Sequence, residues 1–156
     1  MAIVDVKDLE ETLALARRLG ERLFPGAVLA LEGTLGAGKT HFVRGVAEGL
    51  GIADSRVVSS PTFVLIQEYD ARLPIYHFDA YRLPRLQDFI DLGVHEYFAG
   101  QGVSIVEWAD KVTEALPPER LWIRFELTGP TSRRLTLLPT GEKYDHLVTP
   151  ISNRER

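Results

Sequence analysis

The amino-acid sequence contains no cysteine among its 156 residues. This absence excludes disulfide bonds, thiolate metal sites and a cysteine nucleophile. The sequence also contains no basic segment. Its 18 lysines and arginines are outnumbered by 22 acidic residues, and the net charge is -4. Affinity for nucleic acid comes mostly from neutralising phosphates, so the composition disfavours autonomous binding to DNA or RNA.

Long apolar runs are absent as well. No segment reaches the ~18 consecutive apolar residues of a membrane-spanning helix. The first residues, MAIVDVKDLEE, carry acidic side chains where a signal peptide has a basic start and an unbroken apolar run. We therefore expect a cytoplasmic protein that does not enter a membrane.

The composition, 45% hydrophobic and 26% charged, is typical of a globular protein of this length. It predicts one domain over residues 1–156. The last dozen residues are polar enough that we expect them to be partly frayed.

The spacing of apolar residues predicts an α/β fold in which helices alternate with short strands. The predicted helices cover residues 8–23, 42–51 and 108–116, with further helical turns within 85–98 that break at Gly93. The predicted strands are 27–33, 62–69, 73–79, 103–107, 121–127 and 133–139. Only three residues separate the second strand from the third, which permits an antiparallel hairpin but no parallel crossover. We therefore expect a mixed parallel and antiparallel sheet flanked by helices.

Residues 33–40, GTLGAGKT, match a phosphate loop. Its glycines allow successive backbone N–H groups to face an anion, and the following helix adds its positive end. Lys39 is predicted to reach the β and γ phosphates of a nucleotide, and the Thr40 hydroxyl to bind magnesium. The alternative is a glycine-rich turn without a ligand, but the loop follows a buried strand and opens an amphipathic helix, as a phosphate site requires. The candidate nucleotide-binding residues of the loop are Gly33, Leu35, Gly36, Ala37, Gly38, Lys39, Thr40 and His41.

Two carboxylates stand at the last positions of predicted strands, Asp79 in LPIYHFD and Glu107 in VSIVE. In an open α/β sheet, ligands lie in the crevice outside the carboxyl ends of the strands. Asp79 is predicted to hold magnesium directly or through water, and Glu107 to complete the metal shell or orient a hydrolytic water. For both, the alternative is an acidic residue that caps a turn or helix.

The segment SSPTF, residues 59–63, lies where other phosphate-loop proteins carry a switch loop. Thr62 is positioned to bring its hydroxyl or its carbonyl near the γ-phosphate, unless the segment is only a proline turn that starts a strand. We expect His77 to have a core or hydrogen-bonding role, since the four histidines lack zinc-ligand spacing. Trp108, next to Glu107, could form a wall over the bound nucleotide or simply pack, and its spacing alone favours packing. Arg82 and Arg134 could reach phosphate, but solvated surface positions are the default expectation for arginine.

The ordered set GTLGAGKT, SSPTF, YHFDAYRL, LGVHEYF and SIVEWADK resembles the bacterial TsaE family. Members of that family are small ATPases needed for threonylcarbamoyladenosine (t6A) modification of tRNA. The resemblance implies that Lys39 binds phosphate, that Trp108 is functionally important and that Thr62 belongs to a switch-like segment. It also implies a metal site of Thr40, Asp79 and Glu107.

Three positions depart from the family pattern. Thr34 and His95 stand where aspartate is common, and His41 where a second threonine or serine often follows the loop. None of the three removes a phosphate or metal ligand, so the expectation of ATP and Mg²⁺ as cofactors stands.

The resemblance implies that TsaD and TsaB are the partners, and that tRNA is engaged only through their complex. We expect a phosphate-loop ATPase that is slow alone, because no arginine is clearly placed to act as a finger in cis. The γ-phosphate and magnesium are expected to order residues 59–63 and so to change association with the partners. Lys39, Asp79 and Glu107 are the predicted catalytic residues.

Two other functions remain open at this point. A phosphate-loop small-molecule kinase is disfavoured because no arginine-rich lid helix and no acceptor pocket are evident after Asp79. A binding module would use ATP only as a structural ligand. The absence of a guanine-reading NKxD string favours ATP over GTP.

Overall fold

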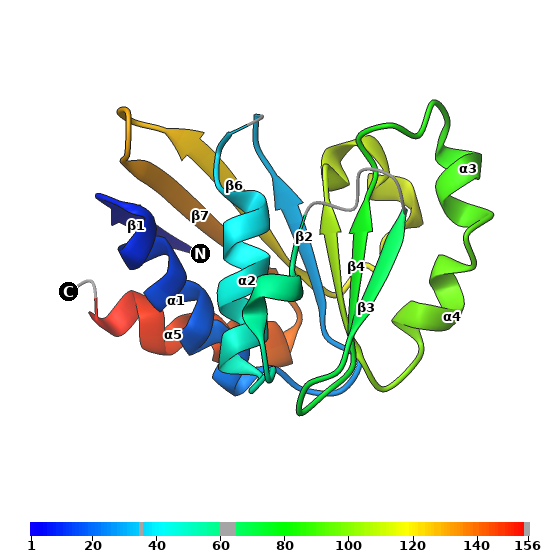
Figure 1. Ribbon diagram of the computed structural model, residues 1–156, viewed down its shortest axis with the longest axis horizontal. Coiled ribbons are helices and arrows are strands. Elements are labelled where there is room, and N and C mark those ends of the chain that lie inside the picture. The colour runs from blue at the N-terminus through cyan, green and yellow to red at the C-terminus, as the bar shows by residue number, and fades with distance from the viewer. Residues whose placement is uncertain (35, 60–64, 155–156) are drawn as a thin grey trace.

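The computed structural model describes residues 1–34, 36–59 and 65–154 of the chain (Figure 1). Within these residues, seven strands form one sheet in the order β1-β7-β6-β2-β5-β4-β3. The strands are β1 (Ala2–Val6), β2 (Val28–Glu32), β3 (Ile66–Tyr69), β4 (Ile75–Asp79), β5 (Val103–Glu107), β6 (Arg120–Leu127) and β7 (Arg133–Thr140). The α-helices are α1 (Leu9–Arg22), α2 (Lys39–Gly49), α3 (Leu86–Ile90), α4 (Val94–Phe98) and α5 (Glu142–Arg154).

The sheet has a parallel centre and antiparallel margins, which confirms the predicted mixed sheet. β2 runs parallel to both β5 and β6, and β4 runs parallel to β5. The β3–β4, β6–β7 and β1–β7 pairs are antiparallel. The carboxyl ends of β2, β4 and β5 therefore lie at one edge of the sheet, at the top of Figure 1.

The sheet is covered on both faces, because alternate residues of its central strands enter two different hydrophobic clusters. In β2, Leu29 and Leu31 pack in the cluster that includes residues of α1, α2 and α5. Val28 and Ala30 pack in the cluster that includes residues of α3 and α4. A strand buried on both faces explains the continuous apolar run from which β2 was predicted.

Helix α2 packs unusually close to α1 because glycines form the contact. A Cβ at Gly45 would lie 2.6 Å from the Ala16 Cβ, and one at Gly49 would lie 2.2 Å from the Arg17 carbonyl oxygen. Side chains at these points would push α2 away from α1. The two glycines thus determine how closely α2, the helix that begins at the phosphate loop, packs against α1.

The structure corrects the prediction of one short helix over residues 108–116. Two 3₁₀ turns, η2 (Ala109–Lys111) and η3 (Thr113–Ala115), occupy this segment. Trp108 has a left-handed φ of 60° and therefore lies outside any helix, and Val112, with φ of -133°, separates the two turns and prevents one continuous α-helix.

Both ends of the chain also differ from the sequence-based expectation. Of the last dozen residues, predicted to be partly frayed, residues 155–156 lie outside the described residues, and residues 145–154 belong to α5, in which Tyr144, Leu147, Val148 and Ile151 are buried. Their spacing of three and four residues places them on one helix face. β1 was not predicted, because five residues with alternating burial give a weak signal without their partner β7. No helix in the described part of the chain is long and apolar enough to cross a membrane.

Candidate nucleotide site

The phosphate-loop motif connects β2 to α2, as predicted. Gly36 and Gly38 have φ values of 78° and 101°, and a Cβ at either position would meet nothing within 4 Å. Their need for glycine is therefore conformational rather than steric. Gly38 is the N-cap of α2 and offers no side-chain hydrogen bond to the first N–H groups of the helix. The free backbone N–H groups at such a helix start can bind an anion. Leu35, also predicted to bind nucleotide, lies outside the described residues.

Lys39, the first residue of α2, is folded back over its own loop. Its ammonium group donates hydrogen bonds to the carbonyl oxygens of Gly33 and, at 3.4 Å, Thr34. The same nitrogen stands 3.6 Å from the centre of the Trp108 ring, which is a cation–π distance. Burial lowers the pKa of Lys39, and the carboxylates of Glu107 and its neighbours partly oppose this effect. Burial disfavours the charged form of Lys39, so an anionic ligand beside the ammonium group would stabilise that form.

Glu107 is the most enclosed acid of the site. It is 3% exposed and accepts a hydrogen bond from the Thr40 hydroxyl, whose oxygen is 3.2 Å from Oε1 and 3.1 Å from Oε2. His77 Nε2 lies 2.5 Å from Oε2. The prediction that His77 makes hydrogen bonds in the core is confirmed, since its side chain is fully buried.

Asp79 stands directly beside Glu107, because the two residues are register partners at the ends of β4 and β5. Its Oδ1 accepts a hydrogen bond of 2.8 Å from the Tyr81 backbone N–H. Asp79 therefore caps a turn, the alternative considered for it, and still lines the same cleft as Glu107. The two roles are compatible because a carboxylate has several acceptor positions.

A cleft of about 510 Å³ brings most of the predicted site residues together. It is lined by Thr34, Gly36, Ala37, Gly38, Lys39, Thr40, His41, Asp79, Tyr81, Arg82, Glu107 and Trp108. Gly33 belongs to the site because its carbonyl oxygen accepts a hydrogen bond from the Lys39 ammonium group. Thr62 lies outside the described residues. Arg134 is on the surface, where its Nε donates a hydrogen bond of 2.8 Å to the Asp5 carboxylate.

The Thr40 hydroxyl and the carboxylates of Asp79 and Glu107 lie together in the cleft at the start of α2. Among the described residues, no cluster of three or more histidines, cysteines, aspartates or glutamates has the geometry of a metal site. A metal held here would therefore complete its coordination with phosphate oxygens and water. This donor set fits Mg²⁺, which binds through few protein oxygens and keeps several waters.

Two further residues of the site were not singled out from the sequence. Tyr81 packs against Trp108, with the ring centroids 4.8 Å apart and the ring planes tilted by 39°. Arg133 donates a hydrogen bond of 3.2 Å to the Gly36 carbonyl oxygen and so reaches the phosphate loop from β7. The adjacent Arg133 and Arg134 look alike in the sequence, and only the strand geometry shows which one faces the loop.

Comparison with known proteins gives one consistent family. A profile described as "Threonylcarbamoyl adenosine biosynthesis protein TsaE" matches residues 6–135. A Bacillus subtilis (strain 168) protein called "tRNA threonylcarbamoyladenosine biosynthesis protein TsaE" is 48% identical over 147 residues, which cover 94% of this chain and 90% of that protein. A protein of the same name from Treponema pallidum (strain Nichols) is 39% identical over 131 residues, which cover 84% of this chain and 96% of that protein.

A solved structure agrees over almost the entire chain. The protein described as "Crystal structure of Bacillus subtilus YdiB" superposes with a TM-score of 0.84 at 42% identity, covering 99% of this chain and 96% of that one. The shared fold, the matched profile and the ordered motifs all lead to the same conclusion. The chain belongs to the TsaE family.

Proposed function

We propose that this protein is a magnesium-dependent ATPase required for t6A modification of tRNA, and that it acts through nucleotide-dependent association with a TsaB–TsaD complex. The observation that carries the ATPase proposal is the meeting of buried Lys39 with Thr40, Asp79 and Glu107 in one cleft at the start of α2. The t6A role is supported by the names of two relatives that are 48% and 39% identical to this chain.

Two clefts on either side of the phosphate loop suggest how ATP lies. The first, of about 510 Å³, contains Lys39 and the acidic residues and suits the β and γ phosphates. The second, of about 410 Å³, is lined by Asp8, Leu9, Thr12, Gly36, Ala37, Gly38, His41, Pro130, Thr131 and Arg133. The two clefts share residues 36–38 and His41, so a nucleotide that crosses the loop would place its nucleoside in the second.

Each of these residues would have a different role in ATP hydrolysis, according to its chemistry. Thr40 and Asp79 would hold Mg²⁺, with Glu107 beside them, and the bound ion would neutralise charge on the phosphate oxygens. Lys39 would exchange the carbonyl oxygens of its own loop for phosphate oxygens. Glu107 or Asp79 would accept a hydrogen bond from the attacking water and orient it towards the γ-phosphate.

The partner complex, rather than this chain, is proposed to hold tRNA. The net charge of -4 does not favour direct binding of a polyanion. ATP turnover would change association with TsaB and TsaD and so sustain the modification cycle. A single domain and a cytoplasmic location remain predictions from the sequence.

The deciding experiment measures ATP hydrolysis by the purified protein with magnesium, alone and with the matching TsaB and TsaD. A rate that rises with the partners and disappears in Lys39→Ala is the expected result. Transfer of phosphate to a metabolite instead of water would favour the kinase function. Normal partner binding and normal t6A levels in a Glu107→Gln variant would favour the binding module and contradict a role for hydrolysis.

A further inference from the structure

We infer that His77 is a positioning residue that aims the Glu107 carboxylate into the cleft, and that Tyr69 fixes the orientation of His77. The inference deepens the proposed ATPase function and rests on it. It assigns a role to a buried titratable side chain that touches neither the loop nor the proposed nucleotide. The contacts form a continuous line from β3 through β4 and β5 to α2.

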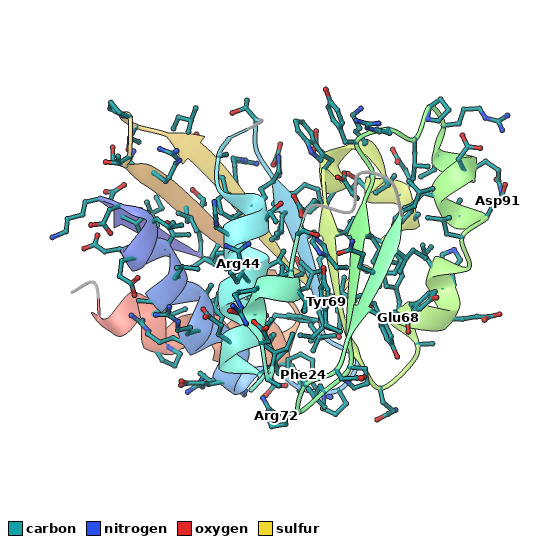
Figure 2. The ribbon with its side chains drawn as sticks, in the orientation of Figure 1. Phe24, Arg44, Glu68, Tyr69, Arg72 and Asp91 are labelled. Carbon is teal, nitrogen blue, oxygen red and sulfur yellow. The ribbon has the colours of Figure 1, made fainter. Side chains whose placement is uncertain are left out.

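Strand register brings these side chains onto one face of the sheet. Gln67 of β3 pairs with His77 of β4, which pairs with Ile105 of β5. Tyr69 and Glu107 each stand two residues beyond those partners, so both project from the same face as His77. Figure 2 shows Tyr69 on the side of β3 that faces α2, whereas its neighbour Glu68 points away towards α4.

Both nitrogens of the His77 ring have a hydrogen-bonding partner, which restricts how the ring can lie. A carboxylate can only accept, so the 2.5 Å contact with Glu107 requires the proton on Nε2. The Tyr69 hydroxyl oxygen lies 3.0 Å from Nδ1, so the second ring nitrogen also has a polar partner. Because the ring is fully buried, its two nitrogens depend on these partners for hydrogen bonding.

The Tyr69 hydroxyl has one proton, which it donates to Gln67 Oε1, while its oxygen lies against His77 Nδ1. Burial raises the pKa of Tyr69 to about 12, although a hydrogen bond with the Ser59 backbone acts in the opposite direction. The hydroxyl thus keeps its proton across the pH range in which enzymes are assayed. Its ring also packs against the imidazole, with centroids 5.9 Å apart.

The consequence concerns which way Glu107 points. Thr40 and His77 hold the carboxylate from two sides. If Thr40 turns its hydroxyl oxygen to magnesium, the bond from His77 remains to keep Glu107 directed at the metal and the water. Outer partners of this kind orient the groups that do the chemistry without touching the substrate.

The test compares His77→Leu, His77→Gln and Tyr69→Phe with the full-length wild type. Leucine removes both ring nitrogens, glutamine returns a donor near the Nε2 position, and phenylalanine removes only the hydroxyl. Tyr76→Phe is the matched control, because Tyr76 lies on the same strand as His77 but packs against Tyr97 in the other layer, with ring centroids 4.8 Å apart.

Two quantities are measured for each variant. One is kcat and KM for ATP hydrolysis in the presence of the partners, and the other is the Mg²⁺ dependence of binding of a fluorescent ATP analogue. We expect His77→Leu and Tyr69→Phe to raise the magnesium concentration needed for the half-maximal effect, or to lower kcat, by about 10–100-fold. Analogue binding without magnesium should stay within about twofold of wild type, and His77→Gln should restore most of the loss.

The possible outcomes separate this inference from the ATPase proposal. If wild type hydrolyses ATP and both His77→Leu and Tyr69→Phe match it in kcat and magnesium dependence, the positioning role is wrong while the ATPase proposal stands. If wild type shows no turnover but the variants shift the magnesium dependence of analogue binding as expected, the positioning role stands and the ATPase proposal is wrong. Equal loss of binding with and without magnesium would indicate a structural role only. If His77→Leu does not fold, Tyr69→Phe alone decides.

Discussion

The hydrogen bond between Thr40 and Glu107 leads to a quantitative prediction for the protein without ligands. Thr40→Val keeps the shape of the side chain and removes the donor, and Thr40→Ser keeps the donor. Glu107→Met replaces the carboxylate by an unbranched apolar chain of similar length. The double variant completes a thermodynamic cycle that isolates the interaction of the two side chains.

The expected magnitude follows from the geometry. A hydrogen bond to a charged group contributes about 1.5–3 kcal/mol to the free energy of unfolding. The Thr40 hydroxyl has one proton, which it shares between two carboxylate oxygens at 3.1 and 3.2 Å. These distances exceed the ~2.5–2.7 Å of a strong bond between a hydroxyl and a carboxylate. We therefore expect a coupling free energy at the lower end, about 1.5 kcal/mol.

Urea denaturation in the presence of EDTA measures the four unfolding free energies. Thr40→Val should destabilise the wild type by about 1.5 kcal/mol, and Thr40→Ser by less than about 0.5 kcal/mol. In the Glu107→Met background, the effect of Thr40→Val should almost vanish. If the two single changes instead add to within about 0.5 kcal/mol, the side chains are not coupled, and Thr40 does not hold Glu107 in the unliganded protein.

Three other predictions concern the packing of α2 against α1, the phosphate loop and Tyr69 of β3. Gly49→Ala should lower the free energy of unfolding by about 1–3 kcal/mol in urea denaturation despite alanine's better helix propensity, because its Cβ would lie 2.2 Å from the Arg17 carbonyl oxygen, a backbone atom that cannot turn aside. Arg133→Met, which loses the hydrogen bond to the loop carbonyl, should weaken ATP binding about tenfold in calorimetric titration, whereas Arg134→Met should change the dissociation constant by less than about twofold. The pKa of Tyr69 is raised from 10.0 to about 12 in the folded protein, so the unfolded chain loses this proton first; stability should be unaffected below pH 10 and should fall as the pH rises from 10 to about 12, and this part of the slope should be missing in Tyr69→Phe.

The sequence by itself determined the features that depend on short-range spacing. The phosphate loop was predictable because its glycines, its lysine and its threonine act through the backbone of one continuous turn. The mixed sheet was predictable because three residues cannot form a parallel crossover. The positions of Asp79 and Glu107 at strand ends were visible in the same way, since parallel neighbours end at one edge.

Only the tertiary structure decided which side chains meet. The contact of His77 with Glu107 depends on the register between β4 and β5, and the closeness of Lys39 to Trp108 depends on a left-handed residue after β5. No local pattern encodes either. In α5, the sequence does carry a helical spacing at Tyr144, Leu147, Val148 and Ile151, but polar residues surround it, and only the tertiary structure shows that these four side chains are buried. Local spacing sets the backbone motifs, whereas the pairing of distant strands and helices sets the partners of each side chain, because those contacts join residues far apart in the chain.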